Sequence, residues 1–521
     1  MDPALALEVA ALSKQRAIID AIEKGGSGVQ QFYNGAVVFV TGGSGFLGKQ
    51  LIEKLLRSCD VKKIFVLLRE KKGKTMEARL EEFLEDPVFE LLCKKKPSFS
   101  NKLHAIAGDI MELKLGISED DWSIITKEIN VILHIAATTR FDESLKVATI
   151  TNVRGTREAL NLGKSCQNLK SFVHVSTAYS HATVSRVRRE VADDFYDVPV
   201  PPNVLIEMVE HIDEGRLNDA TNKFIGDWPN TYCFTKAVAE EAVRTMSDGL
   251  PVCIVRPAIV VGAYREPSPG WIDMSCAYGP SGLILGVGLG LLHTNFADPK
   301  IQVDLVPADL VNNAILVAAH QTAHANGEKK IYTVCSARNS ITWGAIGDIY
   351  RNEARSLSSP KAVWYCYGID VPNKWLFTIM FWLLHYIPAY VIDGVCLCIG
   401  QNRRFVKLYT KAYKMFDFFS YFTTHEWRFK DGNTQEMIQR SSESDRAIFN
   451  CDITSLHWKE YILIWSMGLR KYIVKDGLTG TDYAVKKQHF FFVLNLIVTA
   501  LYAYFWWSLF SFINSAVRYV L

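Results

Sequence analysis

The stretch that most constrains the fold of this chain is residues 36–51, AVVFVTGGSGFLGKQL. Residues 37–40 are apolar and mostly β-branched, which predicts a buried strand, and the glycines that follow Thr41 prevent that strand from continuing. From Phe46 onward, apolar residues recur at helical spacing. The sequence therefore predicts a tight glycine turn where a strand passes into a helix.

Gly42, Gly45 and Gly48 give this turn a GxxGxxG pattern. Without Cβ atoms, the backbone can approach a pyrophosphate, whose charge meets free N–H groups and the positive end of the helix dipole. The spacing differs by one residue from the GxGxxG of simple dinucleotide folds. An ordinary glycine-rich turn is the alternative, but the flanking strand and helix favour a dinucleotide site.

Composition excludes some partners. The chain has 521 residues, is 49% hydrophobic and has a formal net charge of +3, which argues against nucleic acid binding. Its eleven cysteines include no CxxC pair and no histidine at zinc spacing, so we expect reduced cytosolic thiols and no metal site. Residues 1–33 carry charges that rule out a secretion signal and predict an amphipathic leader helix ending at Gly25 and Gly26.

Two apolar segments lie in the distal half. Residues 490–513 carry no formal charge and are long enough to cross about 30 Å of hydrocarbon as a transmembrane helix. A buried core helix or an oligomer contact is the alternative. Residues 375–384 are too short to span and run into His385 and Pro388, which leaves a core helix or a membrane-surface or acyl-binding element.

Strand-like segments alternate with helical ones over about the first 310 residues. After the opening strand, they are residues 63–68, 103–107, 131–136 and 171–175. This alternation predicts a parallel sheet wound by helices on both faces, with ligands at the carboxyl ends of its strands.

Arg69 directly follows the second of these strands. In dinucleotide folds an acid at this point binds the 2′-hydroxyl of NAD, whereas a base accommodates the 2′-phosphate of NADP. Arg69 therefore favours NADPH, and Lys71 and Lys72 are placed to assist. The alternative for this REKK run is a solvated helix start.

Tyr232 and Lys236 are four residues apart, so on a helix they occupy one face. An ammonium about 4 Å from a phenol favours the phenolate, and we expect it to lower the tyrosine pKa from about 10 by roughly three units. Ser176 and Thr177 follow the fifth strand, where a hydroxyl can hold a carbonyl oxygen beside the tyrosine. The set predicts a carbonyl reductase.

Several motifs together resemble the extended short-chain dehydrogenases/reductases: TGGSGFLG, the GD at 108–109, HIAA at 134–137, NVRGT at 152–156, HVSTAY at 174–179, YCFTK at 232–236 and VRP at 255–257. Three further motifs resemble those of the fatty acyl-CoA reductases: STAY, PGWID at 269–273 and GPSG at 279–282. Residues 449–472 are similar to that family's C-terminal helical domain.

The resemblance implies roles for individual residues. Tyr232 would protonate the substrate carbonyl, Lys236 would bind the nicotinamide ribose, and Thr177, favoured over Ser176, would hold the substrate oxygen. Asn152 would support Lys236 through a water. The NADPH site would comprise Thr41, Gly42, Gly45, Phe46, Leu47 and Gly48 around the pyrophosphate, Arg69 at the 2′-phosphate, Asp109 and Ile110 at the adenine, Ala136 and Ala137 at the nicotinamide half, together with Asn152, Tyr232, Lys236 and Pro257.

The fold implied is α/β, a Rossmann-like doubly wound parallel sheet followed by a C-terminal helical domain and a C-terminal transmembrane helix. We expect a reductase domain over 34–342, a linker over 343–361 and a helical domain over 362–475. The activity implied is the NADPH-dependent reduction of a long-chain fatty acyl-CoA to a primary alcohol through a bound aldehyde.

Two other functions stay open from the sequence. One is an extended reductase acting on a sterol or another carbonyl or hydroxyl substrate, and the other is a catalytically idle membrane scaffold. The tail predicts attachment to the endoplasmic reticulum membrane with the catalytic domain in the cytosol, with the peroxisomal membrane or lipid droplets as alternatives. A homo-oligomer is one option that the sequence leaves open.

Overall fold

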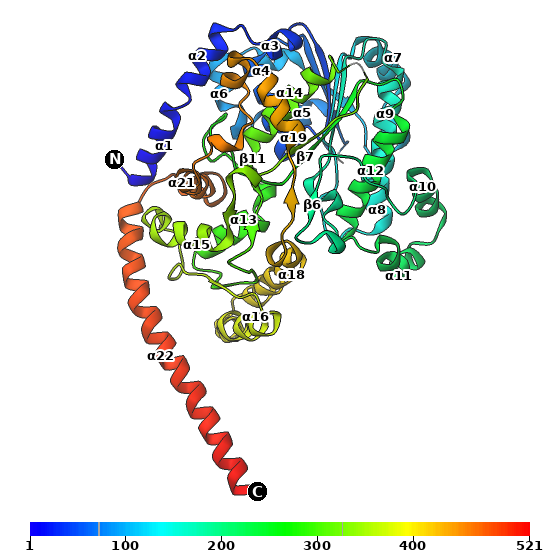
Figure 1. The fold of residues 1–521 in the computed structure, drawn as a ribbon. Helices are drawn as coiled ribbons and strands as arrows, with labels where there is room; N and C mark the ends of the chain where they lie inside the picture. The colour runs from blue at the N-terminus through cyan, green and yellow to red at the C-terminus, as the bar shows by residue number, and fades with distance from the viewer. Residues whose placement is uncertain (71–72, 326, 521) are drawn as a thin grey trace.

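The computed structural model describes residues 1–70, 73–325 and 327–520. A seven-stranded parallel sheet lies at its centre, with the strand order β12-β7-β5-β4-β1-β2-β3 (Figure 1). The strands are β1 Val37–Thr41, β2 Lys63–Leu68, β3 Leu103–Ala107, β4 Val131–His134, β5 Ser171–Val175, β7 Val252–Pro257 and β12 Ile331–Val334.

The remaining strands are short and form four separate pairs. They are β6 Glu190–Val191 with β15 Arg428–Phe429, β8 Ile259–Val261 with β11 Leu305–Pro307, β9 Thr294–Asn295 with β14 Ile369–Asp370, and β10 Gln302–Val303 with β13 Ile341–Thr342.

The α-helices surround the sheet and continue into the C-terminal half. In chain order they are α1 Pro3–Ser13, α2 Arg16–Lys24, α3 Gly28–Tyr33, α4 Phe46–Ser58, α5 Met76–Leu84, α6 Glu90–Lys95, α7 Glu119–Glu128, α8 Leu145–Thr149, α9 Gly155–Ser165, α10 Pro202–His211, α11 Glu214–Ile225, α12 Thr231–Met246, α13 Gly279–Gly288, α14 Ala308–Thr322, α15 Trp343–Asn352, α16 Lys374–Phe381, α17 Ile387–Cys398, α18 Phe405–Thr424, α19 Gly432–Arg440, α20 Glu443–Ile448, α21 Trp458–Gly468 and α22 Thr481–Val520.

The sheet is doubly wound, which confirms the predicted fold class. Val38 and Val40 of β1 belong to the core that α4 and α14 cover, whereas Val37 and Phe39 belong to the core that α9 and α12 cover. Successive side chains of a strand point to opposite faces, so a strand with two covered faces needs a continuous apolar run. The strand order reverses between β1 and β4, which places the ligand crevice at their carboxyl ends.

The five predicted sheet strands are all present, with one difference in length. The fourth ends at His134 instead of residue 136, and β7 and β12 are two further strands that were not predicted. Thr41 of β1 lies opposite His134 of β4, and His134 lies opposite His174 of β5. These strand ends therefore meet at one edge of the sheet.

The leader is not a single helix ending at Gly25 and Gly26. Two helices, α1 and α2, occupy residues 3–24 and meet near residues 14–15, and α3 follows them. The leader is held at several points: Lys14 pairs with Glu460 at 2.9 Å, and the Asp2 carboxylate accepts a 2.9 Å hydrogen bond from the Thr481 amide at the start of α22.

Residues 343–361, expected as a linker, contain helix α15, which contacts α21. The C-terminal half also shares its core with the sheet domain. Trp465 and Tyr461 of α21 are fully buried in the same cluster as β1, and the Tyr461 hydroxyl donates a 2.6 Å hydrogen bond to the Gly262 carbonyl. The aromatic residues of α21 therefore serve as core.

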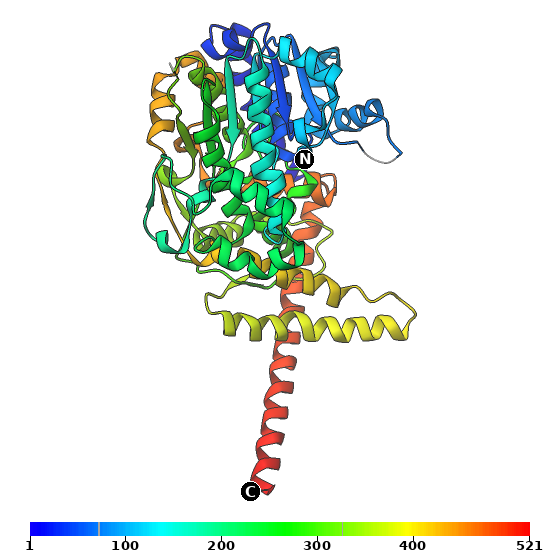
Figure 2. The same ribbon diagram turned by 90° about the vertical axis from the view of Figure 1, so that its right-hand side faces the viewer.

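In the part of the chain that the structure describes, two helical segments have the length and composition to cross a membrane, residues 374–398 and 481–515. The second belongs to α22, which leaves the body of the protein and extends away from it (Figures 1 and 2). The first is longer than the predicted 375–384, because a π-helical turn over residues 382–386 joins α16 to α17 and carries the helix through Pro388. Figure 2 shows this joined helix lying crosswise to α22.

Candidate active site

The glycine turn between β1 and α4 is tightly packed. Gly42 has φ +71°, and a Cβ there would lie 2.7 Å from the Ala136 amide nitrogen; a Cβ on Gly48 would collide with the Gly42 carbonyl oxygen. Gly45 is the N-cap of α4, and no side chain caps the helix. The turn therefore leaves the backbone N–H groups at the start of a 13-residue helix without a side-chain cap, an arrangement that fits a pyrophosphate.

The other predicted residues of this turn have side chains that face protein. Phe46 stacks on Trp271 with ring centroids 5.2 Å apart. The Leu47 side chain is partly buried against the core, and its carbonyl accepts a 3.1 Å hydrogen bond from Asn312. Any contact of these two residues with a cofactor would therefore come from the backbone amides at the start of α4.

Thr41 takes part in a hydrogen-bond chain below the crevice. Its Oγ1 accepts from the Ala136 amide at 3.2 Å and lies 2.8 Å from His134 Nδ1, while His134 Nε2 lies 3.1 Å from Thr156 Oγ1. The Thr156 hydroxyl donates to the Asn152 carbonyl at 2.7 Å. The chain closes only if Thr41 donates to Nδ1 and a neutral His134 donates from Nε2. Burial and the charge of Lys236 lower the pKa of His134 to about 3, consistent with a neutral ring.

Tyr232 and Lys236 lie on α12, as predicted, but the pKa prediction for Tyr232 is wrong. Burial, with Cys233 nearby, raises the pKa of Tyr232, and a hydrogen bond with the Thr177 hydroxyl only partly opposes this. It is Lys236 whose pKa falls, to about 8, because the side chain is buried; the charge of Glu240 opposes that fall. Lys236 Nζ donates to the Val175 carbonyl at 2.8 Å, which fixes the ammonium at the end of β5.

The two hydroxyls after β5 have different partners. Ser176 Oγ donates to Glu240 Oε1 at 2.5 Å, whereas Thr177 Oγ1 lies 3.4 Å from the Pro257 carbonyl, accepts from the Tyr179 amide at 3.2 Å and bonds to Tyr232. Ser176 therefore belongs to a buried network, and Thr177 is the hydroxyl beside the tyrosine.

Glu240 was not among the predicted site residues. It lies one turn beyond Lys236 and two beyond Tyr232, and its carboxylate binds the buried Arg256 side chain at 2.6 Å and His181 Nε2 at 3.4 Å. Burial alone would raise the pKa of Glu240, but Arg256 and His181 lower it, so the group is ionised. The sequence did contain a signal for Glu240, because this acidic residue falls on the same face of a buried helix as Tyr232.

Asn152 does not bond to Lys236 directly. Its amide oxygen accepts from the Thr138 backbone amide at 3.0 Å, and its Nδ2 donates to Thr235 Oγ1 at 3.0 Å and to the Thr138 carbonyl at 3.3 Å. It lies in a π-helical turn over residues 150–154, which turns its side chain toward this loop. Asn152 thereby ties the loop after β4, with the part-exposed Ala136 and Ala137, to α12.

Arg69 follows β2 as predicted and forms a two-point ion pair with Asp109. The Arg69 Nε to Asp109 Oδ2 distance is 2.8 Å and the Nη2 to Oδ1 distance is 3.1 Å, and the arginine side chain is 62% exposed. Ile110 packs against Gly155, where a Cβ would lie 2.6 Å from Ile110 Cγ1. Lys71 and Lys72 lie outside the described residues.

An aromatic group stands beside Tyr232. Phe141 lies with its ring centroid 5.7 Å from that of Tyr232, 5.2 Å from Phe419 and 5.4 Å from Phe422. Phe419 and Phe422 come from α18, far along the chain. The C-terminal half therefore supplies an apolar wall next to the tyrosine.

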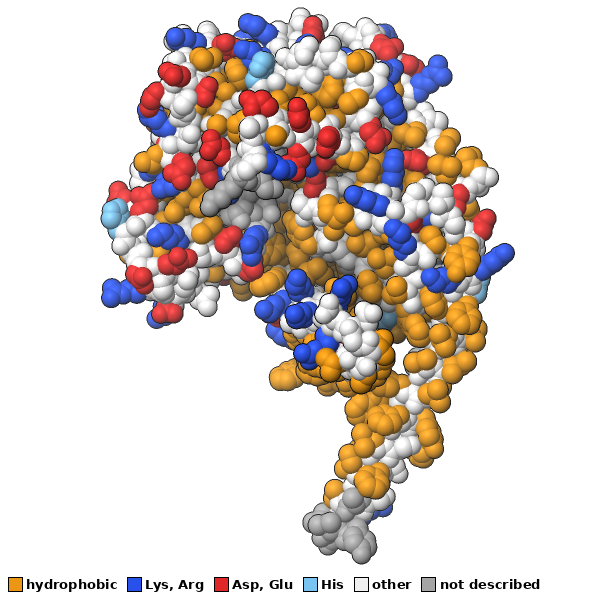
Figure 3. Space-filling view, turned by 180° about the vertical axis from the view of Figure 1, so that it is seen from behind, with side chains coloured by type: hydrophobic (Ala, Val, Ile, Leu, Met, Phe, Trp, Pro, Cys, Tyr) orange, Lys and Arg blue, Asp and Glu red, His pale blue; other side chains and the backbone are white. Residues whose placement is uncertain are grey.

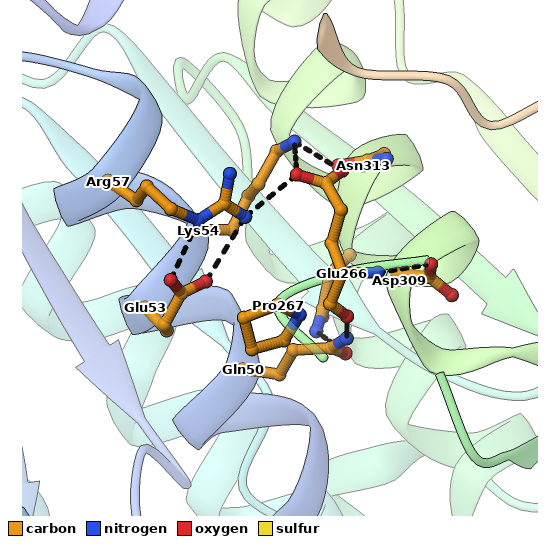
Figure 4. A pocket seen from close by; sticks show the side chains of 9 residues that line it. Gln50, Glu53, Lys54, Arg57, Glu266, Pro267, Asp309 and Asn313 are labelled. Carbon is orange, nitrogen blue, oxygen red and sulfur yellow. Dashed lines mark hydrogen bonds and ion pairs between the residues drawn. The ribbon is translucent and has the colours of Figure 1, made fainter. Parts of the chain in front are cut away.

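A separate buried polar cluster lies behind α4 and is drawn in Figure 4. Glu266 binds Lys54 at 2.6 Å and Arg57 at 2.7 Å, and Arg57 also pairs with Glu53 at 2.7 Å. Asp309 of α14 accepts from the backbone amides of residues 264–266. The space between these side chains is too small for a water molecule, so the cluster holds α4 in place and is not a ligand site.

The fold and the glycine turn define the class of protein: a dinucleotide-binding α/β protein built on a doubly wound parallel sheet. A family model described as male sterility protein matches residues 40–315 as an NAD-binding domain, and a second model with that description matches residues 384–476. The fatty acyl-CoA reductase wat of Drosophila melanogaster is 37% identical over 491 residues, 94% of each chain. Fatty acyl-CoA reductase 1 of Homo sapiens is 37% identical over 474 residues, 88% of each.

The chain therefore belongs to the fatty acyl-CoA reductase family, which confirms the resemblance. Solved structures support the fold. The terminal R domain of the myxalamid PKS-NRPS pathway aligns with a TM-score of 0.56 and 19% identity, over 84% of this chain and 91% of that one. The reductase domain of a non-ribosomal peptide synthetase from Mycobacterium tuberculosis gives 0.54 and 19%, over 90% and 99%.

Proposed function

We propose that this protein reduces long-chain fatty acyl-CoA to the primary fatty alcohol with NADPH, through a bound aldehyde and two hydride transfers. The observation that carries this proposal is the contact of Phe141 with both Tyr232 and Phe419. An alkyl chain next to the reacting carbonyl needs an apolar surface, since burial is worth about 0.8 kcal/mol per CH₂. The names of the relatives support the thioester as the reacting group.

The residues of this chain fit a bound NADPH. The bare N-terminus of α4 would hold the pyrophosphate, and the exposed Arg69 would face the 2′-phosphate at the end of β2. Lys236, fixed on the Val175 carbonyl, would reach the nicotinamide ribose. When bound, the cofactor supplies the hydride to the carbonyl carbon.

Thr177 would bind the carbonyl oxygen of the substrate, and Tyr232 would protonate it. The Thr177 hydroxyl donates a hydrogen bond to it, and Tyr232 transfers its phenolic proton as negative charge develops there. Because its pKa is raised, Tyr232 is fully protonated at neutral pH and is available as the proton donor.

The first round gives a hemithioacetal, which releases CoA as its thiol and leaves an aldehyde. The second round reduces that aldehyde at the same tyrosine. Together the two rounds add two hydrides and two protons to the thioester and yield one alcohol and one free thiol. Attachment to the endoplasmic reticulum membrane with the reductase part in the cytosol completes the proposal.

Product analysis tests this function directly. Purified protein would be supplied with acyl-CoA thioesters of increasing length and with NADPH or NADH, and the lipids would be identified by mass spectrometry. Fatty alcohol and two equivalents of oxidised NADPH per free thiol support the proposal. Oxidation or reduction of a 3β-hydroxysteroid instead would favour the sterol alternative. Binding of cofactor without any turnover would favour the scaffold.

A further inference from the structure

The joined helix α16–α17 has two faces of different character. Its buried face is a line of residues at strict four-residue spacing, all at most 4% exposed: Phe377, Phe381, His385, Ala389 and Asp393. Its opposite face is apolar and open to solvent. The exposed residues include Trp375 (81%), Ile379 (56%), Tyr390 (55%), Val391 (63%), Val395 (57%) and Ile399 (67%).

The buried face holds the helix to the protein by specific bonds. His385 Nε2 accepts a 3.0 Å hydrogen bond from the His293 amide, and Phe377 stacks on Phe296 at 5.2 Å. The Asp393 carboxylate accepts from the amides of residues 404–406 at 2.9–3.0 Å and so fixes the start of α18. A helix that crossed a bilayer would have to give up these contacts, so residues 374–398 lie along the protein surface instead.

A row of cations borders the apolar face. Figure 3 shows Lys and Arg side chains gathered above a wide hydrophobic area at the base of the molecule, beside α22. The exposed basic residues of the loop and of α18 are Arg403, Arg404, Lys407, Lys411 and Lys414. Within the described residues none of the five forms an ion pair with an acidic side chain, and residues 394–416 contain no Asp or Glu.

The position of the joined helix α16–α17 relative to α22 indicates what covers its exposed apolar face. The joined helix lies crosswise to α22 where α22 leaves the body (Figure 2), and the Tyr502 hydroxyl donates a 2.9 Å hydrogen bond to the Leu383 carbonyl. A bilayer that receives the apolar α22 therefore meets α16–α17 on the same side of the protein. An apolar helix face bordered by Lys and Arg is the pattern of a helix lying in a membrane interface.

We infer that α16–α17, with the five cations beside it, is a second membrane-binding element, which lies flat against an anionic bilayer where α22 enters it. The apolar face enters the acyl boundary and the cations bind lipid phosphates. Through α18, the same element reaches Phe419 and Phe422 near Tyr232. A second copy of the chain fits this surface less well, because two such cationic rows would face each other.

The test uses the full-length protein in sealed vesicles that contain a phospholipid with a photoreactive group in its acyl chain. One vesicle set is phosphatidylcholine with phosphatidylserine, and the other is phosphatidylcholine alone. Peptide mass spectrometry is expected to find label in residues 375–399 as well as in α22, at least threefold more in the anionic set, and none in α10. Label confined to α22 in both sets would overturn the inference.

Variants sharpen the test. Ile379→Glu with Val391→Glu should lower labelling of 375–399 at least fivefold and leave α22 labelled, and the triple change R403Q/R404Q/K407Q should remove the preference for anionic vesicles. Leu113→Glu, at an exposed apolar position of the sheet domain (62%), is the matched control. A cysteine at Asn402 that an impermeant maleimide reaches only from the far side of the membrane would instead indicate a span. Loss of label from residues 375–399 together with cross-links between copies of the chain would indicate self-association. Either the far-side maleimide reaction or these cross-links would overturn the inference.

Discussion

Ser176 and Glu240 are joined by a 2.5 Å hydrogen bond between hydroxyl and carboxylate, across 64 residues of sequence. The bond assigns the two hydroxyls after β5 to different tasks. Ser176 satisfies a buried acid, while the neighbouring Thr177 stands beside Tyr232. Glu240, Arg256 and Ser176 therefore form a buried network, which we call the ionic layer, that supports the tyrosine site.

Thr177→Ala is expected to reduce kcat/KM by about 10²-fold, because it removes a hydrogen-bond donor to the carbonyl oxygen in the transition state. Ser176→Ala should reduce it by less than tenfold but lower the free energy of unfolding by about 1–3 kcal/mol, since Glu240 loses a buried partner. Steady-state kinetics and thermal unfolding measure both. Thr177→Ser keeps the hydroxyl and should retain most of the activity; equal rate losses in the two alanine variants would contradict the assignment.

Glu240→Gln tests the ionic layer. Removing the charge leaves Arg256 buried without a counter-charge, and we expect about 3 kcal/mol of lost stability. Since Glu240 opposes the fall in the pKa of Lys236, its loss should also move that pKa below 8. Thermal unfolding and the pH dependence of kcat/KM measure the two effects. Glu241→Gln, which removes a carboxylate that pairs with the more exposed Arg244, is the matched control and should leave the pH dependence unchanged.

Activity should fall as pH rises through about 8. Burial has lowered the pKa of Lys236 to about 8, so its ammonium is present below this value and is lost above it. Burial also keeps His134 and His174 neutral over this range, because their pKa values lie well below 6.5. The falling limb of kcat/KM between pH 6 and 10 therefore reports Lys236, and a rate that stays level to pH 9.5 would show that its charge is not needed.

The strands of the sheet were predictable to the extent that their residues form uninterrupted apolar runs. A parallel strand buried on both faces must be largely apolar, so residues 37–40 and 64–68 stand out in the sequence. The glycine turn was predictable because close backbone approach admits no other residue at Gly42 or Gly48. The resemblance to a known family supplied the substrate class.

What the sequence could not reveal depends on contacts between distant residues. The lowered pKa expected for Tyr232 assumed a free ammonium beside it, whereas Lys236 is bound to the Val175 carbonyl and the phenol is buried. Glu240 acquires its role only through Ser176 and Arg256. The predicted end of the apolar helix at residue 384 was wrong because a π-helical turn accommodates Pro388.

Tyr232→Phe is expected to lower turnover by at least 10³-fold, because the ring remains in place but its proton is lost. Cofactor binding should change less than twofold, since the glycine turn and Lys236 are untouched. Turnover is measured by product formation, and binding by titration of NADPH fluorescence. Turnover within tenfold of the unmodified protein would exclude Tyr232 as the proton donor.

In our proposal Arg69 selects NADPH over NADH, and its ion pair with Asp109 allows a second variant to test this role. Arg69→Glu places two carboxylates at the end of β2, which should repel a 2′-phosphate and weaken NADPH binding by at least 30-fold relative to NADH. Asp109→Asn frees the guanidinium and should strengthen NADPH binding two- to fivefold unless Asp109 itself binds the adenosine. The dissociation constants of both cofactors measure these shifts. Arg79→Gln is the control, because Arg79 donates a 2.6 Å hydrogen bond to the Arg69 carbonyl and leaves the guanidinium of Arg69 unaffected. An unchanged NADPH to NADH ratio in Arg69→Glu would mean that the 2′-phosphate is held elsewhere.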